Sequence, residues 1–305
     1  MSLSDEVSDR IATSFGQAAS IYHAQAGLQK HCAQRLLNLL SDSLEYPDLP
    51  SGPVLEIGCG TGFITELLCD RLLRPEGAGT YSLKLGQGRD YYITDLSAEM
   101  VQFCCDRLQP KLQKITSNHP FSSFKHPRSH FFFQVLNAEN IPPNPPSYSL
   151  IIGGFVAQWF QDIEGTIQKL LDRLQPHGRL LLSFPGYESF PEWRQQCSHL
   201  NLPFTAHPLP NPTLLLQTLS LPTQDYQVQV KTEWYPTYYE SAATFFQSMK
   251  GIGAGLSQAN IKLTARQMRQ LLREWQPLNL AKLGHSAPEK LEVNYQIVYL
   301  LIVKP

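Results

Sequence analysis

Val54-Leu55-Glu56-Ile57-Gly58-Cys59-Gly60-Thr61-Gly62-Phe63 is the stretch that predicts the fold. Its first four residues indicate a buried parallel strand, and apolar residues recur at helical spacing from Phe63 onward. The glycines between them lack the Cβ atoms that would keep a ligand off the backbone, and the helix behind them begins with free N–H groups. Glu56 stands at the carboxyl end of the strand, where it can face that ligand. The stretch therefore predicts a nucleoside-binding loop between a strand and a helix.

The spacing of the glycines distinguishes two kinds of nucleotide site. A dinucleotide-binding loop would place a further glycine at position 63, where this chain has Phe63. The pattern Glu-x-Gly-x-Gly-x-Gly instead resembles the first motif of class I S-adenosylmethionine (SAM) methyltransferases. That resemblance implies SAM as the cofactor, held by Glu56, Gly58, Gly60 and Gly62. The alternative is a tight strand–helix turn that binds nothing.

A second acid, Asp95, ends the next predicted strand and is expected to accept hydrogen bonds from the ribose hydroxyls. It follows Gly62 by 33 residues, against about 20 in an ordinary unit of this kind. The segment 75–88 is rich in Gly and Pro and accounts for the excess as an inserted surface loop. The alternative for Asp95 is a residue that merely starts a helix.

The predicted cofactor site has further members at the ends of later strands. SAM enzymes typically carry an acid after the third strand, and Asn137 occupies that place here. Its amide oxygen can still accept a hydrogen bond from the adenine amino group. The remaining predicted cofactor-binding residues are Leu96, Ala138 and Phe155.

Alternation of strands and helices continues along the chain. The further predicted strands are 130–136, 148–155, 179–184, 226–234 and 291–303, and the predicted helices are 96–108, 163–174, 242–249 and 265–275. A polar connection is expected at 110–129. Repeated alternation indicates an α/β, doubly wound sheet with its active site at the carboxyl ends of the strands. We therefore predict a Rossmann-like, class I SAM methyltransferase sheet of seven strands with an antiparallel last strand.

Two regions extend this minimal pattern. Residues 1–45 carry apolar side chains at helical spacing from Ile21 to Leu40, which predicts an amphipathic helical cap over the cofactor site. Residues 46–305 would form the methyltransferase domain. Within it, the proline-rich segment at about 186–224 is predicted to be a partly helical lid insertion.

Composition narrows the class of protein. A chain of 305 residues that is 42% hydrophobic can bury a large core, and its net charge of −1 gives no reason to expect nucleic acid. No run of eighteen apolar residues or export signal is found, so we expect no membrane span and a cytoplasmic location. The six cysteines lack metal-ligand spacing and are expected to remain thiols. His119, His126 and His130 lie apart from acids and cysteines, so no metal site is predicted.

Flanking motifs resemble one family in particular, the malonyl-acyl-carrier-protein O-methyltransferases of biotin synthesis. The resemblance runs from about residue 15 to residue 305. Its pieces are the segments 15–22, 158–162, 192–194, 249–254, 294–300 and 304–305. The chain departs from the family pattern at Asn137, Ser149, Gly153-Gly154 and His177, which raises the question of whether activity is reduced.

The resemblance implies that Tyr22 and Arg194 bind the malonyl end of the acceptor. The enzyme would transfer a methyl group from SAM to the free carboxylate of malonyl-acyl carrier protein or malonyl-CoA, giving the methyl ester that primes pimeloyl synthesis for biotin. That carboxylate is ionised near neutral pH, so the reaction needs no general base, and an arginine fork suits its orientation. The alternatives are a surface salt bridge for Arg194 and simple packing for Tyr22.

An acyl carrier protein is acidic, so its docking calls for local positive charge. Lys262, Arg266, Arg269 and Arg273 recur at helical spacing and are the expected docking residues, with Lys250 nearby in sequence. That face could equally be a solvated one. Two other functions remain open: a SAM-dependent methyltransferase of another small carboxylic acid or a quinone-like acceptor, and a SAM-binding assembly factor that has lost catalysis.

Overall fold

The computed structural model describes most of the chain. The described residues are 12–13, 16, 26–42, 49–73, 88–116, 129–142, 147–219, 226–251, 262–276 and 290–305. Most of the surface loop predicted at 75–88 lies outside them, as does 117–128 of the connection predicted at 110–129. The end of the predicted lid, 220–224, also lies outside.

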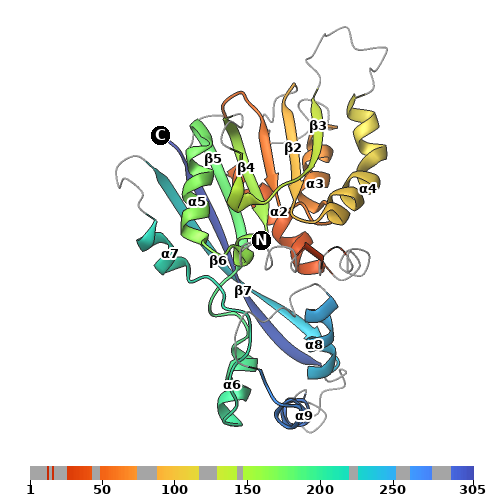
Figure 1. The fold of residues 1–305 in the computed structure, drawn as a ribbon, viewed down its shortest axis with the longest axis vertical. Coiled ribbons are helices and arrows are strands. Elements are labelled where there is room, and N and C mark those ends of the chain that lie inside the picture. The colour runs from red at the N-terminus through yellow and green to blue at the C-terminus, as the bar shows by residue number, and fades with distance from the viewer. Residues whose placement is uncertain are drawn as a thin grey trace. The chain divides into compact units, whose positions relative to one another are not determined.

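A seven-stranded sheet forms the centre of the described chain (Figure 1), in the order β3-β2-β1-β4-β5-β7-β6. Its strands are β1 (Val54–Ile57), β2 (Asp90–Asp95), β3 (His130–Val135), β4 (Tyr148–Gly154), β5 (Leu174–Pro185), β6 (Gln227–Tyr239) and β7 (Leu291–Val303). The first five pair in parallel. From β1 the chain adds β2 and β3 on one side of the sheet and then β4 and β5 on the other. The strand order therefore reverses between β1 and β4, and ligands bind at such a reversal in open α/β sheets. The doubly wound prediction is confirmed.

Strand β7 runs antiparallel to β5. The His177 N–H donates to the Lys304 carbonyl at 3.0 Å, and the Gly186 N–H donates to the Gln296 carbonyl at 2.7 Å. Residue numbers therefore rise along one strand as they fall along the other. The antiparallel end of the sheet is as predicted from the sequence.

The described helices are α2 (Gly27–Asp42), α3 (Phe63–Leu72), α4 (Ala98–Thr116), α5 (Ile163–Asp172), α6 (Pro191–His199), α7 (Pro212–Thr218), α8 (Ala242–Gly251) and α9 (Ala265–Glu274), with short 3-10 turns η1 (Ala138–Asn140) and η2 (Ala157–Trp159). Helix α3 contacts α2 on one side and α4 on the other, and α4 packs on β2 and β3. Buried Leu36 of α2, Leu68 of α3 and Leu108 of α4 fill this layer.

Helix α4 is longer than the sequence predicts. It was expected to end at residue 108 and instead continues through Pro110 to Thr116. An internal proline removes one helical hydrogen bond and normally ends a helix. Here the next residue, Lys111, forms ion pairs with Glu66 and Asp70 of α3, which hold the following turn in place. The predicted start of the connection at residue 110 was wrong because a tertiary contact outweighs the local signal.

Two strands also extend beyond their predicted ends. Residues 175–178, between the predicted helix 163–174 and the predicted strand 179–184, form an irregularity inside β5, where the pairing with β4 shifts register, and His177 adopts a left-handed φ of 61° there. This is a backbone conformation that favours glycine. Strand β6 continues past its predicted end through Pro236. β6 is an edge strand, and edge strands are where sheets tolerate proline.

Contacts between Cα atoms group the chain into two compact units. The first comprises 1–184, 213–231 and 299–305, and the second comprises 185–212 and 232–298. The first contains the glycine loop and the parallel strands. The second contains α6, α8, α9 and an aromatic cluster in which Trp193 contacts the rings of Phe204, Phe245 and Phe246.

Candidate functional site

The glycine loop between β1 and α3 adopts the strained turn that the sequence predicts. Gly58, Gly60 and Gly62 have φ values of 65°, 51° and 88°, in the left-handed region that favours glycine. A Cβ on Gly58 would lie 2.8 Å from Val156 Cγ2, and one on Gly62 would lie 2.5 Å from Cys104 Sγ. Neither position accepts a side chain, so the loop keeps a bare backbone surface.

Asp95 joins this loop to the start of α4. One of its carboxylate oxygens accepts from the Gly60 N–H at 2.8 Å, and the other accepts from the Ser97 N–H at 2.9 Å. Burial raises the pKa of Asp95, although these backbone hydrogen bonds act in the opposite direction. Asp95 forms no ion pair with any cation in the described part of the chain. The half-buried carboxylate of Asp95 therefore joins the carboxyl ends of β1 and β2.

Glu56 lies beneath the loop. Its side chain is fully buried, and Oε2 accepts from the Thr65 hydroxyl of α3 at 2.7 Å. Among the described residues, Oε1 has no hydrogen-bond partner. Burial raises the pKa of Glu56 well above its usual range. The sequence predicts that this acid faces the ligand, whereas the structure turns its carboxyl toward the base of α3.

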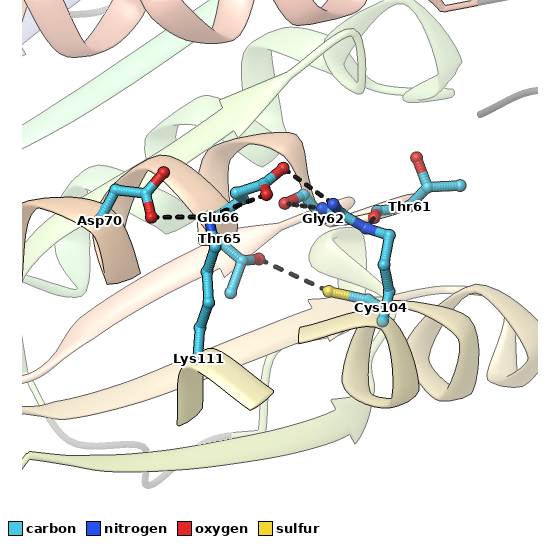
Figure 2. Close-up of polar contacts among 8 residues, drawn as sticks. Thr61, Gly62, Thr65, Glu66, Asp70, Cys104 and Lys111 are labelled. Carbon is cyan, nitrogen blue, oxygen red and sulfur yellow. Dashed lines mark hydrogen bonds and ion pairs between the residues drawn. The ribbon is translucent and has the colours of Figure 1, made fainter. Parts of the chain in front are cut away.

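Side chains of α4 that sequence reasoning missed hold the loop from its other side (Figure 2). Arg107 donates to the Thr61 and Gly62 carbonyls, each at 2.8 Å, and to Glu66 Oε2 at 2.8 Å. Lys111 bridges Glu66 and Asp70. No local pattern signals these contacts, because 45 residues separate Gly62 from Arg107.

The remaining predicted cofactor-binding residues follow the ends of β2, β3 and β4. The Asn137 amide oxygen accepts from the Glu139 N–H at 2.9 Å and so caps η1. A carbonyl oxygen has a second lone pair, which leaves Asn137 able to accept another hydrogen bond. Ala138 is buried behind it, and Leu96 is half-buried after β2. Phe155 has a φ of 57°, and its N–H donates to the Ser183 carbonyl at 2.7 Å.

Two departures from the family pattern have structural explanations. Ser149 lies near the amino end of β4, opposite to the end where ligands bind, and its hydroxyl accepts from Arg89 at 2.9 Å. The Arg89 guanidinium also donates to the Pro50 and Gly52 carbonyls. A Cβ on Gly153 would lie 2.7 Å from Ile57 Cγ1, so the backbone approach there requires glycine.

In the second unit, Arg194 of α6 lies between two aromatic rings. Its Cζ atom is 4.1 Å from the centroid of the Phe204 ring and 5.3 Å from that of Tyr187. Its Nη2 group donates to the Tyr187 carbonyl at 3.2 Å. No carboxylate in the described residues forms an ion pair with Arg194. The surface salt bridge considered from the sequence therefore has no partner within the described chain.

The segment 186–194, which carries Arg194, is fixed to β7 by side-chain amides. Glu192 accepts from the Asn294 N–H at 3.0 Å and from the Asn294 side-chain amide at 2.6 Å. The Gln296 N–H donates to the Ser189 hydroxyl at 3.1 Å, and this hydroxyl donates to the Gln296 carbonyl at 3.2 Å. Two motif pieces that are about a hundred residues apart in sequence thus meet in one place.

Tyr22 lies outside the described residues, so its expected role remains a prediction. A described neighbour in the same motif piece, Gly16, lies against the start of α4. A Cβ on Gly16 would be 2.7 Å from Glu99 Oε2 and 3.0 Å from the Ser97 hydroxyl. Gly16 therefore lies against Ser97, which follows Asp95 by two residues in sequence.

The basic helix α9 differs from its prediction at one residue. Thr264 and Gln267 form a capping box, so the helix begins at Ala265. Lys262 precedes the cap and is not on the helical face, contrary to the prediction. Arg266, Arg269 and Arg273 are exposed on the helix, and Arg273 pairs with its neighbour Glu274 at 2.9 Å.

A half-open cavity of about 490 Å³ lies between α2 and α3. Its described lining residues are Gly27, Lys30, His31, Gln34, Phe63, Glu66, Leu67 and Asp70. None of these is a predicted site residue. The chemistry predicted from the sequence belongs to the strand ends and not to this groove.

Other predicted absences concern metals, disulfides and membranes. All six cysteines are free thiols, as predicted. Within the described ranges, no group of three or more His, Cys, Asp or Glu could hold a metal ion. None of the described helices is both long enough and apolar enough to cross a membrane.

Comparisons with known proteins agree with the motif resemblance. Residues 24–221 match a family model described as a methyltransferase domain. A malonyl-[acyl-carrier protein] O-methyltransferase from Magnetococcus marinus is 27% identical, over 87% of this chain and 84% of the relative. A relative of the same name from Priestia megaterium is 27% identical over 95% of each chain. The predicted resemblance to this group of proteins is confirmed.

Among solved structures, the YcgJ protein from Bacillus subtilis has a TM-score of 0.52 at 17% identity, covering 89% of this chain and 98% of that chain. A putative methyltransferase from Bacillus halodurans has a TM-score of 0.51 at 9% identity, covering 90% of this chain and 98% of that chain. At these identities the likeness shows the fold alone.

Proposed function

This chain belongs to the methyltransferase-domain family, and we propose that it transfers the methyl group of SAM to the free carboxylate of a malonyl thioester. The malonyl group would be carried by an acyl carrier protein or by coenzyme A. The product would be the methyl ester that primes pimeloyl synthesis for biotin. The names of the curated relatives support this acceptor.

SAM is the cofactor of this enzyme. When bound, it supplies an electrophilic methyl group on a positively charged sulfur. The residues at the strand ends fit such a ligand, because Cβ atoms would fill the loop at Gly58 and Gly62. Asp95 and Asn137 retain acceptor lone pairs for hydroxyl and amino groups. Gly60, Leu96, Ala138 and Phe155 complete the set proposed to hold SAM, with Glu56 acting from beneath the loop.

The observation that carries the proposal is the set of contacts made by the Arg194 guanidinium. Its guanidinium is stacked on Phe204 and Tyr187 and has no carboxylate partner among the described residues. A planar guanidinium held in this way can bind a carboxylate through parallel N–H groups and fix its plane. This favours an acceptor with a free carboxylate over a quinone-like ring.

The chemistry requires little beyond position and charge. A malonyl carboxylate is ionised near neutral pH, so no residue needs to remove a proton. Arg194 is proposed to orient the anion for in-line attack and to leave one oxygen lone pair free, since gripping both oxygens would weaken the nucleophile. Tyr22 is proposed to donate to the other oxygen or to close over SAM, as the family resemblance implies.

The carrier protein is proposed to dock on the exposed arginines of α9. Arg266 and Arg269 present positive charge to an acidic partner, and Arg273 lies one turn further along. Lys262 and Lys250 are exposed and could extend the same surface. Electrostatic complementarity of this kind raises association rates and selects the partner.

The decisive experiment supplies labelled SAM together with malonyl-, succinyl- or acetyl-carrier protein. Label on the malonyl species alone supports both the reaction and the acceptor. Label on succinyl-carrier protein as well would indicate a methyltransferase of small carboxylic acids in general. If SAM binds but no acceptor is labelled, the assembly-factor alternative is favoured instead.

A further inference from the structure

Arg107 of α4 has the most complete set of contacts around the glycine loop (Figure 2). Its Nε donates to the Thr61 carbonyl, its Nη2 to the Gly62 carbonyl and its Nη1 to Glu66, each at 2.8 Å. The guanidinium carbon also lies 5.9 Å from the centroid of the Phe63 ring. All three nitrogens of the group are thus used on the loop or on the first turn of α3.

These contacts oppose the main weakness of a glycine-rich loop. Glycine loses more conformational freedom on ordering than any other residue, and a loop that orders only on binding lowers the affinity for its ligand. The Gly62 carbonyl already accepts from the Glu66 N–H as the first bond of α3. Its second lone pair is taken by Arg107, so this peptide group is held from two directions.

The loop is held at two points by the segment that follows β2. Asp95, at the end of β2, accepts from the Gly60 N–H. Arg107, three turns into α4, donates to the next two carbonyls of the loop. An anion fixes the donor side and a cation fixes the acceptor side, so consecutive peptide groups between residues 60 and 62 keep defined orientations.

We propose that Arg107 is a positioning residue for the SAM-binding loop, which orders Thr61 and Gly62 before the cofactor arrives. It does not touch the reacting atoms. Its effect is on the affinity for SAM, and it holds whichever acceptor the enzyme methylates.

The competing interpretation is that Arg107 only fastens α4 to α3. The neighbouring Lys111 provides the matched control for this, because it pairs with Glu66 and Asp70 of α3 and contacts no loop carbonyl. A change at Lys111 removes helix-to-helix ion pairs and leaves the loop contacts intact.

The test compares Arg107→Lys, Arg107→Met and Lys111→Met in the full-length chain. Each variant is titrated with SAM by calorimetry, and its melting temperature is recorded. Arg107→Met should weaken SAM binding by about tenfold or more, the equivalent of one charge-assisted bond. Arg107→Lys keeps the ion pair with Glu66 but cannot span both carbonyls, so its affinity should be intermediate. Lys111→Met should bind SAM within about twofold of wild type.

Hydrogen exchange at the amides of 60–63 in the SAM-free protein provides a second measurement. Exchange should be faster in Arg107→Lys than in wild type and unchanged in Lys111→Met. Equal losses of SAM affinity in the Lys111 and Arg107 variants would overturn the proposal, since helix packing would then explain both. Wild-type affinity in a folded Arg107→Lys or Arg107→Met protein would overturn it as well.

Discussion

The cofactor loop and the Arg194 segment, 186–194, carry opposite charge patterns. The loop has two acids, the fully buried Glu56 and the half-buried Asp95, and neither forms an ion pair with a cation in the described chain. The segment 186–194 has a cation, Arg194, that forms no ion pair with a carboxylate in the same part of the chain. A positively charged cofactor and a negatively charged acceptor would complement these two patterns respectively.

The two regions also differ in what holds them in shape. The loop is fixed by the strand and the helix that follow it along the chain: Asp95 is 35 residues from Gly60, and Arg107 is 45 residues from Gly62. The segment 186–194 depends on amides of β7, with 102 residues between Glu192 and Asn294. The loop therefore belongs to a local strand–helix unit, whereas the Arg194 segment exists only once the last strand has joined the sheet. Substitutions can test each half of this comparison.

The largest effect is expected where the loop accepts no side chain. Gly62→Val would place a branched side chain against Cys104 at a φ of 88°. The strained backbone and the overpacking should together destabilise the fold by about 2 to 4 kcal/mol and abolish SAM binding. Chemical denaturation and SAM titration measure the two losses. Gly27→Ala is the control, because nothing lies within 4 Å of its new Cβ; a Gly62→Val protein that binds SAM normally would contradict the bare-backbone loop.

The Arg194 half is tested by a graded series. Arg194→Lys keeps the charge but loses the planar fork, and Arg194→Ala loses both, so methylation of malonyl-carrier protein should fall in the order wild type, Lys, Ala. The Ala variant should lose about a hundredfold in kcat/KM, as expected for one charge-assisted pair. SAM affinity should stay constant throughout.

Gln195→Ala, an exposed neighbour on α6, is the control for this series. Full methylation by a folded Arg194→Ala enzyme would remove Arg194 from the acceptor site, and Tyr22 would then have to orient the malonyl group alone.

Asp95, which joins the glycine loop to the start of α4, should affect SAM binding and not acceptor binding. Asp95→Ala removes the proposed ribose contact together with the bonds to the Gly60 and Ser97 N–H groups. Charge-assisted hydrogen bonds contribute roughly 1.5 to 3 kcal/mol, so SAM affinity should fall at least tenfold. Calorimetric titration provides the measurement, with exposed Asp106→Ala as the control on α4. Unchanged affinity in a folded Asp95→Ala protein would exclude the ribose role.

This contrast also explains what the sequence could predict. The bounds of β1 and β7 and the start of α3 were predicted correctly, because long apolar runs and a glycine turn are local signals. The glycine loop and Asp95 were recognised for the same reason. The role of Glu56 stays a prediction, since strand position alone does not show which way a buried carboxyl turns.

Long-range contacts were beyond the reach of local patterns. The hydrogen bonds from Arg107 to the loop and the ion pairs of Lys111 join α4 to α3. The ion pairs of Lys111 also stabilise α4 beyond Pro110. The bond from Glu192 to Asn294 joins the two ends of the second unit. In each of these contacts, the sequence around one residue does not predict which distant residue it contacts. The family resemblance identified both of these motif pieces in the sequence, but it gave no physical reason why they occur together.

A smaller effect is expected at the proposed docking surface. Reversing the charge at Arg266 and Arg269 should raise KM for malonyl-carrier protein roughly threefold to tenfold and leave KM for malonyl-CoA unchanged. The difference should shrink at high salt, because exposed charges are screened over about 8 Å at physiological ionic strength. Steady-state kinetics with both substrates measure it. Lys114→Glu on α4 is the control; if both substrates suffer equally, α9 is not the docking face.

The smallest effect on SAM affinity, and the finest test of the loop, concerns Glu56. Burial raises the pKa of Glu56 in the folded protein, so the fold favours the protonated acid. Its contribution to stability is complete below the unfolded pKa of about 4.3 and is lost as the pH rises through the folded pKa, by about 1.4 kcal/mol per pH unit between the two values. Glu56→Gln cannot ionise and should therefore remove this part of the alkaline loss of stability.

Urea denaturation over a range of pH measures the difference between wild type and Glu56→Gln, and Asp95 titrates in both proteins and cancels. Parallel stability curves would show that Glu56 does not titrate as a buried acid. SAM titration of the same variant tests whether the Glu56 carboxyl contacts the cofactor. A glutamine can accept from Thr65 as Glu56 does, so an acid that acts from beneath the loop predicts SAM affinity within about twofold of wild type. A tenfold loss would instead mean that the carboxyl turns toward the cofactor, as the sequence alone suggests, and the loop would then change shape on binding.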